Sequence, residues 1–189
     1  MDGLAVLASG NENKLRELRH ALLGWEIELL DADEYPPEDG DTYYENARAK
    51  AVFGRTLEPR RWVLGEDSGI EIEGLGGGPG VTSSRWAAGR EAERALEELR
   101  GVEGEGRRAR YVCELVALAP DGTEHRGTGI LDGRIADEPS GAAGFGFDPV
   151  FIPEGEAETV AELGNDWKAA NSHRARAARA LLEALPFGT

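Results

Sequence analysis

The chain has 189 residues, of which 40% are hydrophobic and 30% are charged, enough for one α/β domain with a sizeable core. Its 36 acidic and 21 basic residues give a formal net charge of −15, which argues against binding of a nucleic acid polymer, because such binding needs clustered lysine and arginine. The single cysteine, Cys113, excludes an internal disulfide and a cysteine-based zinc site.

The first predicted elements are a strand, a helix and a second strand. Residues 4–8 form a continuous apolar run, which is typical of a strand buried on both faces. The run is short and has no basic flank, so it predicts neither a signal peptide nor a membrane span, and we expect a cytoplasmic protein. Leu15, Leu18 and Leu22 then recur at helical spacing, and the alternation of residues 25–30 predicts a half-buried strand.

A second helix and a third strand are predicted after an acidic, proline-containing loop. Thr42 and Glu45 have the spacing of a capping box, which marks the start of the helix. Residues 62–64 are typical of a short buried strand that runs into the motif Gly-Glu-Asp-Ser-Gly at residues 65–69. Residues 70–72 then alternate again.

The remainder is predicted to combine glycine-rich loops with short elements. In chain order we expect a glycine-dense loop over residues 74–80, a short helix over 91–99, a flexible connection over 101–106, a hairpin of strands 111–119 and 124–130, a glycine-rich loop over 140–147, an apolar segment over 150–152 and a last helix over about 172–185. The chain contains no repeat and no clear linker, so residues 1–189 are predicted to form a single domain.

The connection between the first strand and the first helix is a candidate phosphate site. It consists of Ser9, Gly10, Asn11, Glu12, Asn13 and Lys14. Backbone N–H groups at a helix N-terminus attract anions, and Lys14 adds a positive charge. The spacing of a Walker loop is absent, and the alternative is an ordinary turn in which Asn11 caps the helix.

Lysine is rare in this chain, because only three of the 21 basic residues are lysines: Lys14, Lys50 and Lys168. Arginine is used wherever a solvated cation suffices. The three lysines therefore indicate positions that need a compact ammonium rather than a planar guanidinium. Biased composition is the alternative explanation.

Glu66 and Asp67, inside the motif at residues 65–69, are candidates for metal binding and proton transfer. We expect them to follow the strand at 62–64, at the carboxyl end where α/β sheets place ligands. Paired carboxylates suit Mg²⁺, and one of them is suited to take a proton from an attacking water. Glu38, in the acidic loop, is a further candidate oxygen ligand. The alternative is a solvated acidic turn.

Two later segments contain side chains suited to a nucleotide. Phe145 and Phe147 lie in the glycine-rich loop beside Asp148, and aromatic faces stack on bases while a carboxylate accepts from ring N–H groups. The alternative is that Phe147 fills the core. His173 and Arg174 open the last helix, where they are suited to bind ligand oxygens, although His173 is equally suited to cap the helix.

Five segments, taken in order, resemble the inosine triphosphate pyrophosphatase family, also called Ham1-like proteins. Residues 9–17 match the family pattern Ser/Thr-x-Asn-x-x-Lys-x-x-Glu, and residues 45–51 match Glu-Asn-Ala-x-x-Lys-Ala. Residues 67–69 match Asp-Ser-Gly, followed by Leu-Gly-Gly-x-Pro-Gly-Val at residues 75–81. Residues 144–149 match Gly-Phe-Gly-Tyr/Phe-Asp-Pro, and residues 172–174 match Ser-His-Arg. The resemblance spans nearly the whole chain, and all three lysines fall on family positions.

The resemblance implies an elongated, two-lobed α/β fold with a long mixed β-sheet flanked by helices, a substrate cleft between the lobes, and a homodimer. It implies hydrolysis of the non-standard purine nucleoside triphosphates ITP, dITP and XTP to the monophosphate and pyrophosphate, with Mg²⁺. Such an activity removes these nucleotides from the nucleotide pool.

The resemblance also implies roles for individual residues. Residues 9–14 and Lys50 would hold the phosphates, and Glu38 and Asp67 would lie at the metal. Asp67 would also be the base that activates water, and Ser68 would touch the substrate. The base and sugar would be surrounded by Phe145, Gly146, Phe147, Asp148, Lys168, His173 and Arg174.

One position of the metal region departs from the family pattern. Glu66 stands where bacterial members commonly have aspartate, which moves a carboxylate outward by one methylene. Two other functions remain as alternatives: a broad nucleoside triphosphate pyrophosphatase with little base preference, and a nucleotide-binding module without turnover in which Glu66 and Asp67 are structural. Release of pyrophosphate from ITP in the presence of Mg²⁺ separates these functions.

Overall fold

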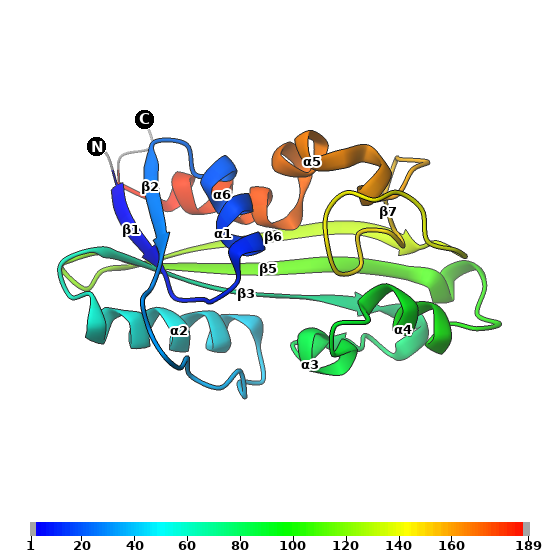
Figure 1. Cartoon of the computed structure of the whole chain (residues 1–189), viewed down its shortest axis with the longest axis horizontal. Coiled ribbons are helices and arrows are strands. Elements are labelled where there is room, and N and C mark those ends of the chain that lie inside the picture. Colours follow the sequence, from blue (N-terminus) through cyan, green and yellow to red (C-terminus); the bar gives the residue numbers. More distant parts are fainter. Residues whose placement is uncertain (1–2, 187–189) are drawn as a thin grey trace. The chain divides into compact units, whose positions relative to one another are not determined.

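A sheet of mixed strand direction organises residues 3–186, the part of the chain that the computed structural model describes (Figure 1). Its strand order is β2-β1-β3-β5-β6-β7, and β4 pairs with β3. Strand β1 is parallel to β2 and β3, whereas β4 and β7 run antiparallel to their neighbours β3 and β6. Helices flank the sheet, so the predicted mixed α/β class is confirmed.

The strands are β1 (Gly3–Leu7), β2 (Trp25–Leu29), β3 (Trp62–Ile72), β4 (Pro79–Gly80), β5 (Arg108–Leu118), β6 (Glu124–Ile135) and β7 (Phe151–Pro153). The helices are α1 (Glu12–Ala21), α2 (Tyr43–Leu57), α3 (Ser83–Ala87), α4 (Glu91–Glu98), α5 (Val160–Asn171) and α6 (His173–Ala184), with 3₁₀ turns at Glu73–Leu75 and Gly104–Arg107. None of the helices within residues 3–186 has the length and apolar character needed to cross a membrane.

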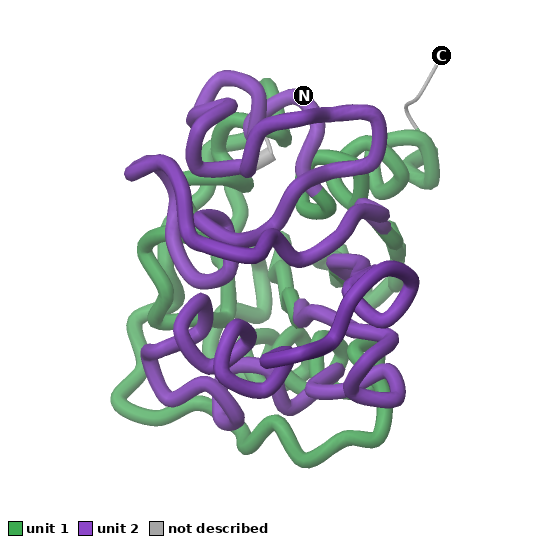
Figure 2. The backbone as a smooth tube through the Cα atoms, turned by 90° about the vertical axis from the view of Figure 1, so that its right-hand side faces the viewer, with its two compact units in different colours: residues 1–67, 113–129, 173–189 green, residues 68–112, 130–172 purple. Residues whose placement is uncertain are grey.

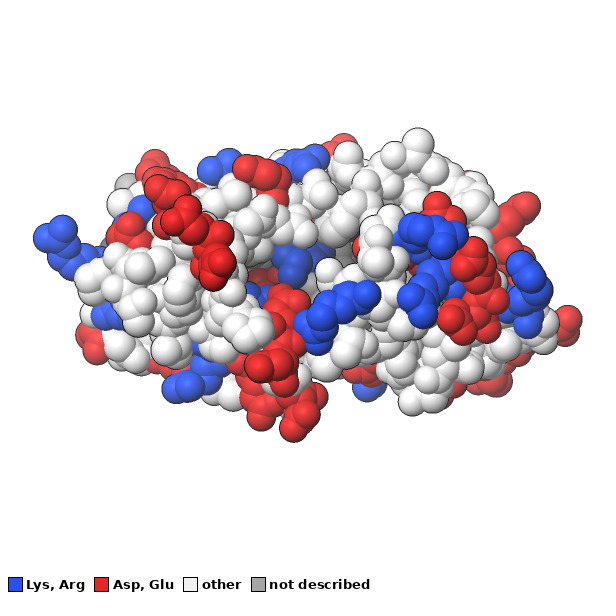
Figure 3. All heavy atoms as spheres, turned by 60° about the horizontal axis from the view of Figure 1, so that its bottom comes forward, with Lys and Arg blue, Asp and Glu red and all other residues white. Residues whose placement is uncertain are grey.

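The chain divides into two compact units, coloured separately in Figure 2. The first unit combines residues 1–67, 113–129 and 173–189, and the second combines residues 68–112 and 130–172. Strands β3, β5 and β6 each contribute residues to both units. On the face drawn in Figure 3, acidic and basic side chains are interspersed.

The first unit is built around strand β1, which is buried on both faces as its apolar run predicts. Ala5 and Leu7 pack into the cluster that contains residues of α1 and α6, whereas Val6 and Ala8 pack into a second cluster with Val63. Helices α1 and α6 lie against each other in the first of these clusters. The predicted start signals are confirmed, because Asn11 caps α1 and the capping box with Thr42 starts α2.

The second unit has its own core, made by side chains of β3, β5 and β7 with helix α4. Phe147 belongs to this core: it is 6% exposed and contacts Tyr111 and Trp86 through its ring. Core filling, the alternative interpretation of Phe147, therefore describes its position in the structure.

One sequence prediction about an element was wrong, and two helices were not predicted. The motif at residues 65–69 does not follow a strand of residues 62–64, since β3 continues through it to Ile72. Helix α5 was not predicted, because Gly164, at φ 84°, interrupts its helical pattern. Helix α3 was also not predicted, and its five residues are too few to show a period.

Gly65 explains how a glycine-rich motif lies inside a strand. A Cβ built on Gly65 would lie 2.0 Å from the Ala47 carbonyl oxygen and 2.6 Å from the Ala51 nitrogen, so only glycine lets α2 approach β3 this closely. This approach brings the side chains of α2 next to Asp67.

We predict that Gly65→Ala destabilises the protein by about 3 kcal/mol or more, because the backbone of α2 has to move away from β3. Urea unfolding followed by circular dichroism measures the change. Gly10→Ala is the control, since its Cβ would meet only the Tyr35 ring, at 3.5 Å, and we expect it to change stability by less than about 0.5 kcal/mol. Equal stability of Gly65→Ala and the wild type would contradict the close approach.

Candidate functional site

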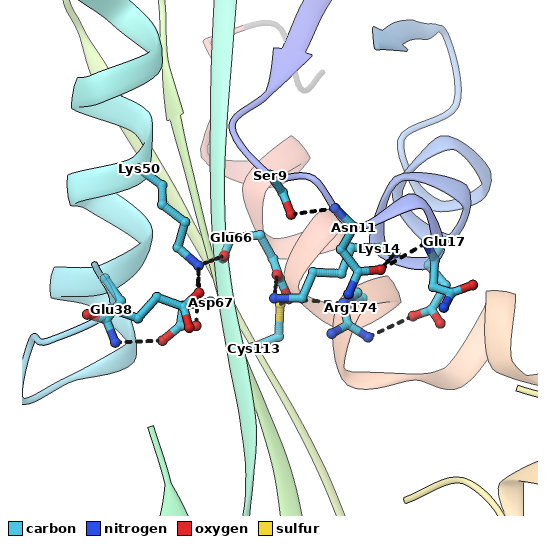
Figure 4. A network of polar contacts seen from close by, with 12 residues as sticks. Ser9, Asn11, Lys14, Glu17, Glu38, Lys50, Glu66, Asp67, Cys113 and Arg174 are labelled. Carbon is cyan, nitrogen blue, oxygen red and sulfur yellow. Dashed lines mark hydrogen bonds and ion pairs between the residues drawn. The ribbon is translucent and has the colours of Figure 1, made fainter. Parts of the chain in front are cut away.

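The side chains of Glu66 and Asp67 point to opposite faces of β3 (Figure 4). Successive residues of a strand alternate between its two faces, so adjacent carboxylates diverge once they lie inside the strand. Glu66 faces side chains from α1 and α6, and Asp67 faces α2. The hypothesis that these two carboxylates jointly hold one metal ion is therefore wrong, and the reason is that β3 extends through both residues.

Glu66 lies at the centre of a buried cluster of opposite charges. Its side chain is 0% exposed, and its two carboxylate oxygens contact Lys14 Nζ at 2.6 Å and Arg174 Nε at 2.9 Å. Burial alone would raise the pKa of Glu66, but the charges of Lys14 and Arg174 outweigh it and hold that pKa well below its ordinary range. Glu66 is therefore ionised at neutral pH.

Two further residues complete this cluster. Arg174 Nη1 donates to Glu17 Oε2 at 3.0 Å, which links the first turn of α6 to α1. The Cys113 thiol donates to Glu66 Oε1 at 3.5 Å. Burial, and then the charge of Glu66, raises the pKa of Cys113, so this cysteine stays a thiol.

Asp67 lies in a second group of polar side chains, on the α2 face. Its Oδ2 accepts from Asn46 Nδ2 at 3.0 Å, and its Oδ1 lies 3.4 Å from Lys50 Nζ. Lys50 Nζ also donates to the Glu66 carbonyl at 2.7 Å and to Glu38 Oε1. Lys50 thereby joins the predicted residues Glu38 and Asp67.

Burial and charge act against each other in this group. Burial raises the pKa of Asp67, and the lowering effects of Lys50 and Asn46 do not fully offset it. Burial would also raise the pKa of Glu38, but the charge of Lys50 outweighs it, so the pKa of Glu38 is lowered. For Lys50, the charges of Asp67 and Glu38 outweigh burial and raise its pKa.

The loop before α1 is organised by Asn11. The Asn11 side chain accepts from the backbone N–H groups of Asn13 at 2.9 Å and Lys14 at 3.2 Å. The backbone N–H of Asn11 donates to Ser9 Oγ at 3.1 Å. The predicted cap therefore uses two of the N–H groups at the start of α1. Gly10 and Glu12 are exposed, and the loop leads directly to Lys14 beside Glu66.

In the second unit, Asp148 and Lys168 form a buried ion pair with Oδ2 and Nζ 2.5 Å apart. The same oxygen accepts from the Phe145 backbone N–H at 2.7 Å, and Lys168 Nζ lies 4.1 Å from the centre of the Phe145 ring. Gly146 has φ 68°, which turns the loop between Phe145 and Phe147. The structure thus brings Phe145, Asp148 and Lys168 together.

The structure places the other predicted residues as follows. Ser68 is half-buried and opens the second unit within β3, and His173 is buried at the first position of α6. Sequence reasoning assigned no role to Glu17 or Asn46, although both stand at fixed positions of the family patterns quoted above. Those positions were the signal that would have identified Glu17 and Asn46.

The charges of the first unit's two groups nearly balance. Three cations, Lys14, Lys50 and Arg174, contact four carboxylates, Glu17, Glu38, Glu66 and Asp67, which leaves one net negative charge. An anionic ligand at these groups therefore needs added positive charge. Glu38 and Asp67 fit that need, because Mg²⁺ takes one or two protein carboxylates and completes its ligands with phosphate and water. Within residues 3–186, no group of three or more His, Cys, Asp or Glu side chains is arranged to hold a metal by itself.

Comparison with known proteins identifies close relatives over nearly the whole chain. The Ham1 family matches residues 5–184. The dITP/XTP pyrophosphatase of Bdellovibrio bacteriovorus is 40% identical, over 95% of this chain and 96% of the relative, and that of Thermus thermophilus is 43% identical, over 97% and 92%. A HAM1 protein from Coxiella burnetii has a similar structure, with a TM-score of 0.80, 33% identity and coverage of 94% of this chain and 95% of that chain.

We predict that Glu66→Gln lowers the free energy of unfolding at pH 7 by about 3–5 kcal/mol, because Lys14 and Arg174 keep their charges but lose a buried counter-charge. The pKa of Glu66 is lower in the folded protein than its ordinary value of 4.5, so its stabilisation is complete above that pH and is lost as pH falls through the folded pKa. The difference between wild type and variant should therefore shrink below pH 4.5.

Urea unfolding at pH values from about 3 to about 8, spaced by about one pH unit, measures this difference in the free energy of unfolding. Glu97→Gln is the control, because Glu97 and its partner Arg90 are both exposed and such pairs contribute about 0–1 kcal/mol. A pH-independent difference for Glu66→Gln would contradict the ionised state of Glu66.

Proposed function

The chain belongs to the Ham1 family, and from this membership we propose that it hydrolyses non-standard purine nucleoside triphosphates, namely ITP, dITP and XTP, to the monophosphate and pyrophosphate. The observation that carries the proposal is the buried Asp67 carboxylate, held by Asn46 and Lys50 beside Glu38. This arrangement combines a base, cations for phosphate and oxygen ligands for a metal within one compact unit.

We assign phosphate binding to the loop before α1 and to the two lysines of the first unit. Residues 9–14 offer exposed backbone at Gly10 next to the start of a helix, where anions are stabilised. Lys14 and Lys50 supply compact positive charges on either face of β3.

Glu38 and Asp67 would hold Mg²⁺, which when bound offsets the charge of the triphosphate and of the leaving pyrophosphate. The products require cleavage of the α–β phosphoanhydride. We assign the attack of water to the α-phosphorus, so that the bond from that phosphorus to the bridging oxygen breaks and pyrophosphate leaves. Asp67 accepts the proton of the water. Asp67 is assigned this role rather than Glu66 because both oxygens of Glu66 contact cations, Lys14 and Arg174, on the other face of β3.

Contacts with the base and sugar are assigned to Ser68, Phe145, Gly146, Asp148 and Lys168 of the second unit, and separately to His173 and Arg174 of the first unit. Arg174 has only hydrogen-bond donors, which match the 6-oxygen of hypoxanthine or xanthine and not the 6-amino group of adenine. Glu66 and Glu17 hold the orientation of its guanidinium. We further infer a homodimer that uses Mg²⁺, as the family resemblance implies, and a cytoplasmic location.

The function is tested by pyrophosphate release from ITP, dITP, XTP, GTP and ATP with saturating Mg²⁺, for the wild type and for Asp67→Asn. We predict preferential turnover of the first three nucleotides and a loss of about 10²–10⁴-fold or more in kcat for the variant, because the base is removed. Circular dichroism and urea unfolding check that the variant is folded.

Two outcomes would replace the proposal. Equal turnover of all five nucleotides identifies a broad pyrophosphatase, and binding of ITP without pyrophosphate release identifies a nucleotide-binding module. Near-native turnover by folded Asp67→Asn would show that Asp67 is neither base nor essential ligand.

The assignment of Arg174 to base recognition leads to a second prediction. Arg174→Ala should lower kcat/KM for ITP and leave the slower ATP reaction nearly unchanged, which narrows the ITP-to-ATP preference by about ten- to a hundred-fold, the value of a lost charge-assisted hydrogen bond. The ratio of kcat/KM for ITP to kcat/KM for ATP is the informative measurement. Partial unfolding of the variant lowers both values equally, so its effect cancels in the ratio. An equal drop for both nucleotides would instead assign Arg174 to holding Glu66 and Glu17.

A further inference from the structure

The ammonium group of Lys50 lies between the two carboxylates to which the proposed function assigns the metal. Its Nζ contacts Glu38 Oε1 and Asp67 Oδ1, and it also donates to the Glu66 carbonyl oxygen (Figure 4). A lysine ammonium has three N–H donors, so these three acceptors saturate it. The Lys50 side chain is 6% exposed, which keeps solvent from competing for these contacts.

A divalent cation and Lys50 compete for the same oxygens. Cations only a few ångströms apart repel strongly where solvent screening is weak. Glu38 Oε1 and Asp67 Oδ1 also cannot direct the same lone pairs at an ammonium and at a metal. Metal binding at Glu38 Oε1 and Asp67 Oδ1 therefore weakens the contacts of Lys50 with these two oxygens.

We propose that Lys50 is an exchangeable counter-ion: in the metal-free protein it holds the Glu38 and Asp67 carboxylates together, and it withdraws from both when a divalent cation binds them. The inference rests on the proposed function for the assignment of Glu38 and Asp67 to the metal. After withdrawal, the ammonium is available to the phosphates of the substrate.

The surroundings of Asp67 support such an exchange. Asn46 donates to the other oxygen, Asp67 Oδ2, at 3.0 Å, and Asn46 Oδ1 accepts from the Gly40 N–H at 2.8 Å. Asp67 therefore keeps its orientation when Lys50 leaves. Lys50 has a flexible four-carbon stem, so its ammonium moves without any change in α2. Lys14 does not take its place, since Lys14 pairs with Glu66 on the opposite face of β3.

The experiment measures binding of Mg²⁺ and Mn²⁺ to the full chain without nucleotide, by calorimetry and by electron paramagnetic resonance of Mn²⁺. We expect Lys50→Met to bind both metals about tenfold or more tightly than the wild type, because a competing positive charge is removed. Lys50→Gln, which keeps a hydrogen-bond donor without the charge, should bind them more tightly as well. Lys50→Arg, which keeps the charge, should not.

Arg48→Met is the matched control. Arg48 lies on the same helix, but its side chain is about half exposed and pairs with Glu124 instead of Glu38 or Asp67. Its removal should change metal affinity by less than about twofold, because exposed charges are screened. Thermal unfolding adds a second measurement: Mg²⁺ should raise Tm more in Lys50→Met than in the wild type.

Metal affinity that is unchanged or weaker in folded Lys50→Met and Lys50→Gln would overturn the inference, as would absence of metal binding in every variant. These results are independent of turnover. Tighter metal binding by Lys50→Met, together with no nucleotide hydrolysis by the wild type, would support the exchange and overturn the proposed function. Hydrolysis of ITP by the wild type, together with unchanged metal affinity in the Lys50 variants, would support the proposed function and overturn the exchange.

Discussion

A fully buried carboxylate is stable only when cations or hydrogen-bond donors surround it, and in this protein Glu66 imposes that requirement on two helices. Lys14 reaches Glu66 from α1, and Arg174 reaches it from the first turn of α6. Arg174 also contacts Glu17 of α1. Glu17 lies three residues after Lys14 and therefore on the same face of that helix. The start of α1, and with it the loop of residues 9–14, is thereby tied to strand β3.

The alternation of side chains along β3 then divides the chemistry between two adjacent carboxylates. Glu66 faces two cations that hold its pKa well below its ordinary range, whereas burial raises the pKa of Asp67. Neighbouring acids whose pKa values move apart take different roles. Glu66 is suited to a permanent charge that positions cations, and Asp67 is suited to exchange a proton. The close approach of α2 at Gly65 is what supplies Asp67 with its partners Asn46 and Lys50.

Much of the local structure could be predicted from the sequence, because local signals specify it. The Asn11 cap, the capping box of Thr42 with Glu45, and the apolar run in β1 all appear as predicted. The length of β3 could not be predicted, since Gly65 and Gly69 weaken a strand pattern, and Gly65 is explained by a tertiary contact with α2. Helix α5 was missed for a similar reason, as Gly164 breaks its periodicity.

The site was predicted residue by residue but not as a set of contacts. The rarity of lysine and the family patterns singled out Lys14, Lys50 and Asp67, which the structure places within the first unit. Their pairing depends on partners that are distant in sequence: Glu66 and Arg174 are 108 residues apart. No local pattern reports such a contact, and none indicates that Glu66 and Asp67 diverge.

The choice between lysine and arginine in this protein follows from how each cation uses its partners. All three lysines contact carboxylates with low exposure: Lys14 contacts Glu66, Lys50 contacts Asp67 and Lys168 contacts Asp148. Arg174 is equally buried and holds Glu17 and Glu66 through different nitrogens of a rigid fork, whereas Lys50 reaches its two carboxylates through one nitrogen. A planar fork suits a fixed arrangement that must not change when a ligand arrives. A single ammonium on a flexible stem is able to leave one anion for another without moving the backbone, and the anions it leaves are then available to a metal. Arg174, whose contacts with Glu17 and Glu66 are fixed, and Lys50, whose contacts exchange, together suit a site for a metal-bound triphosphate.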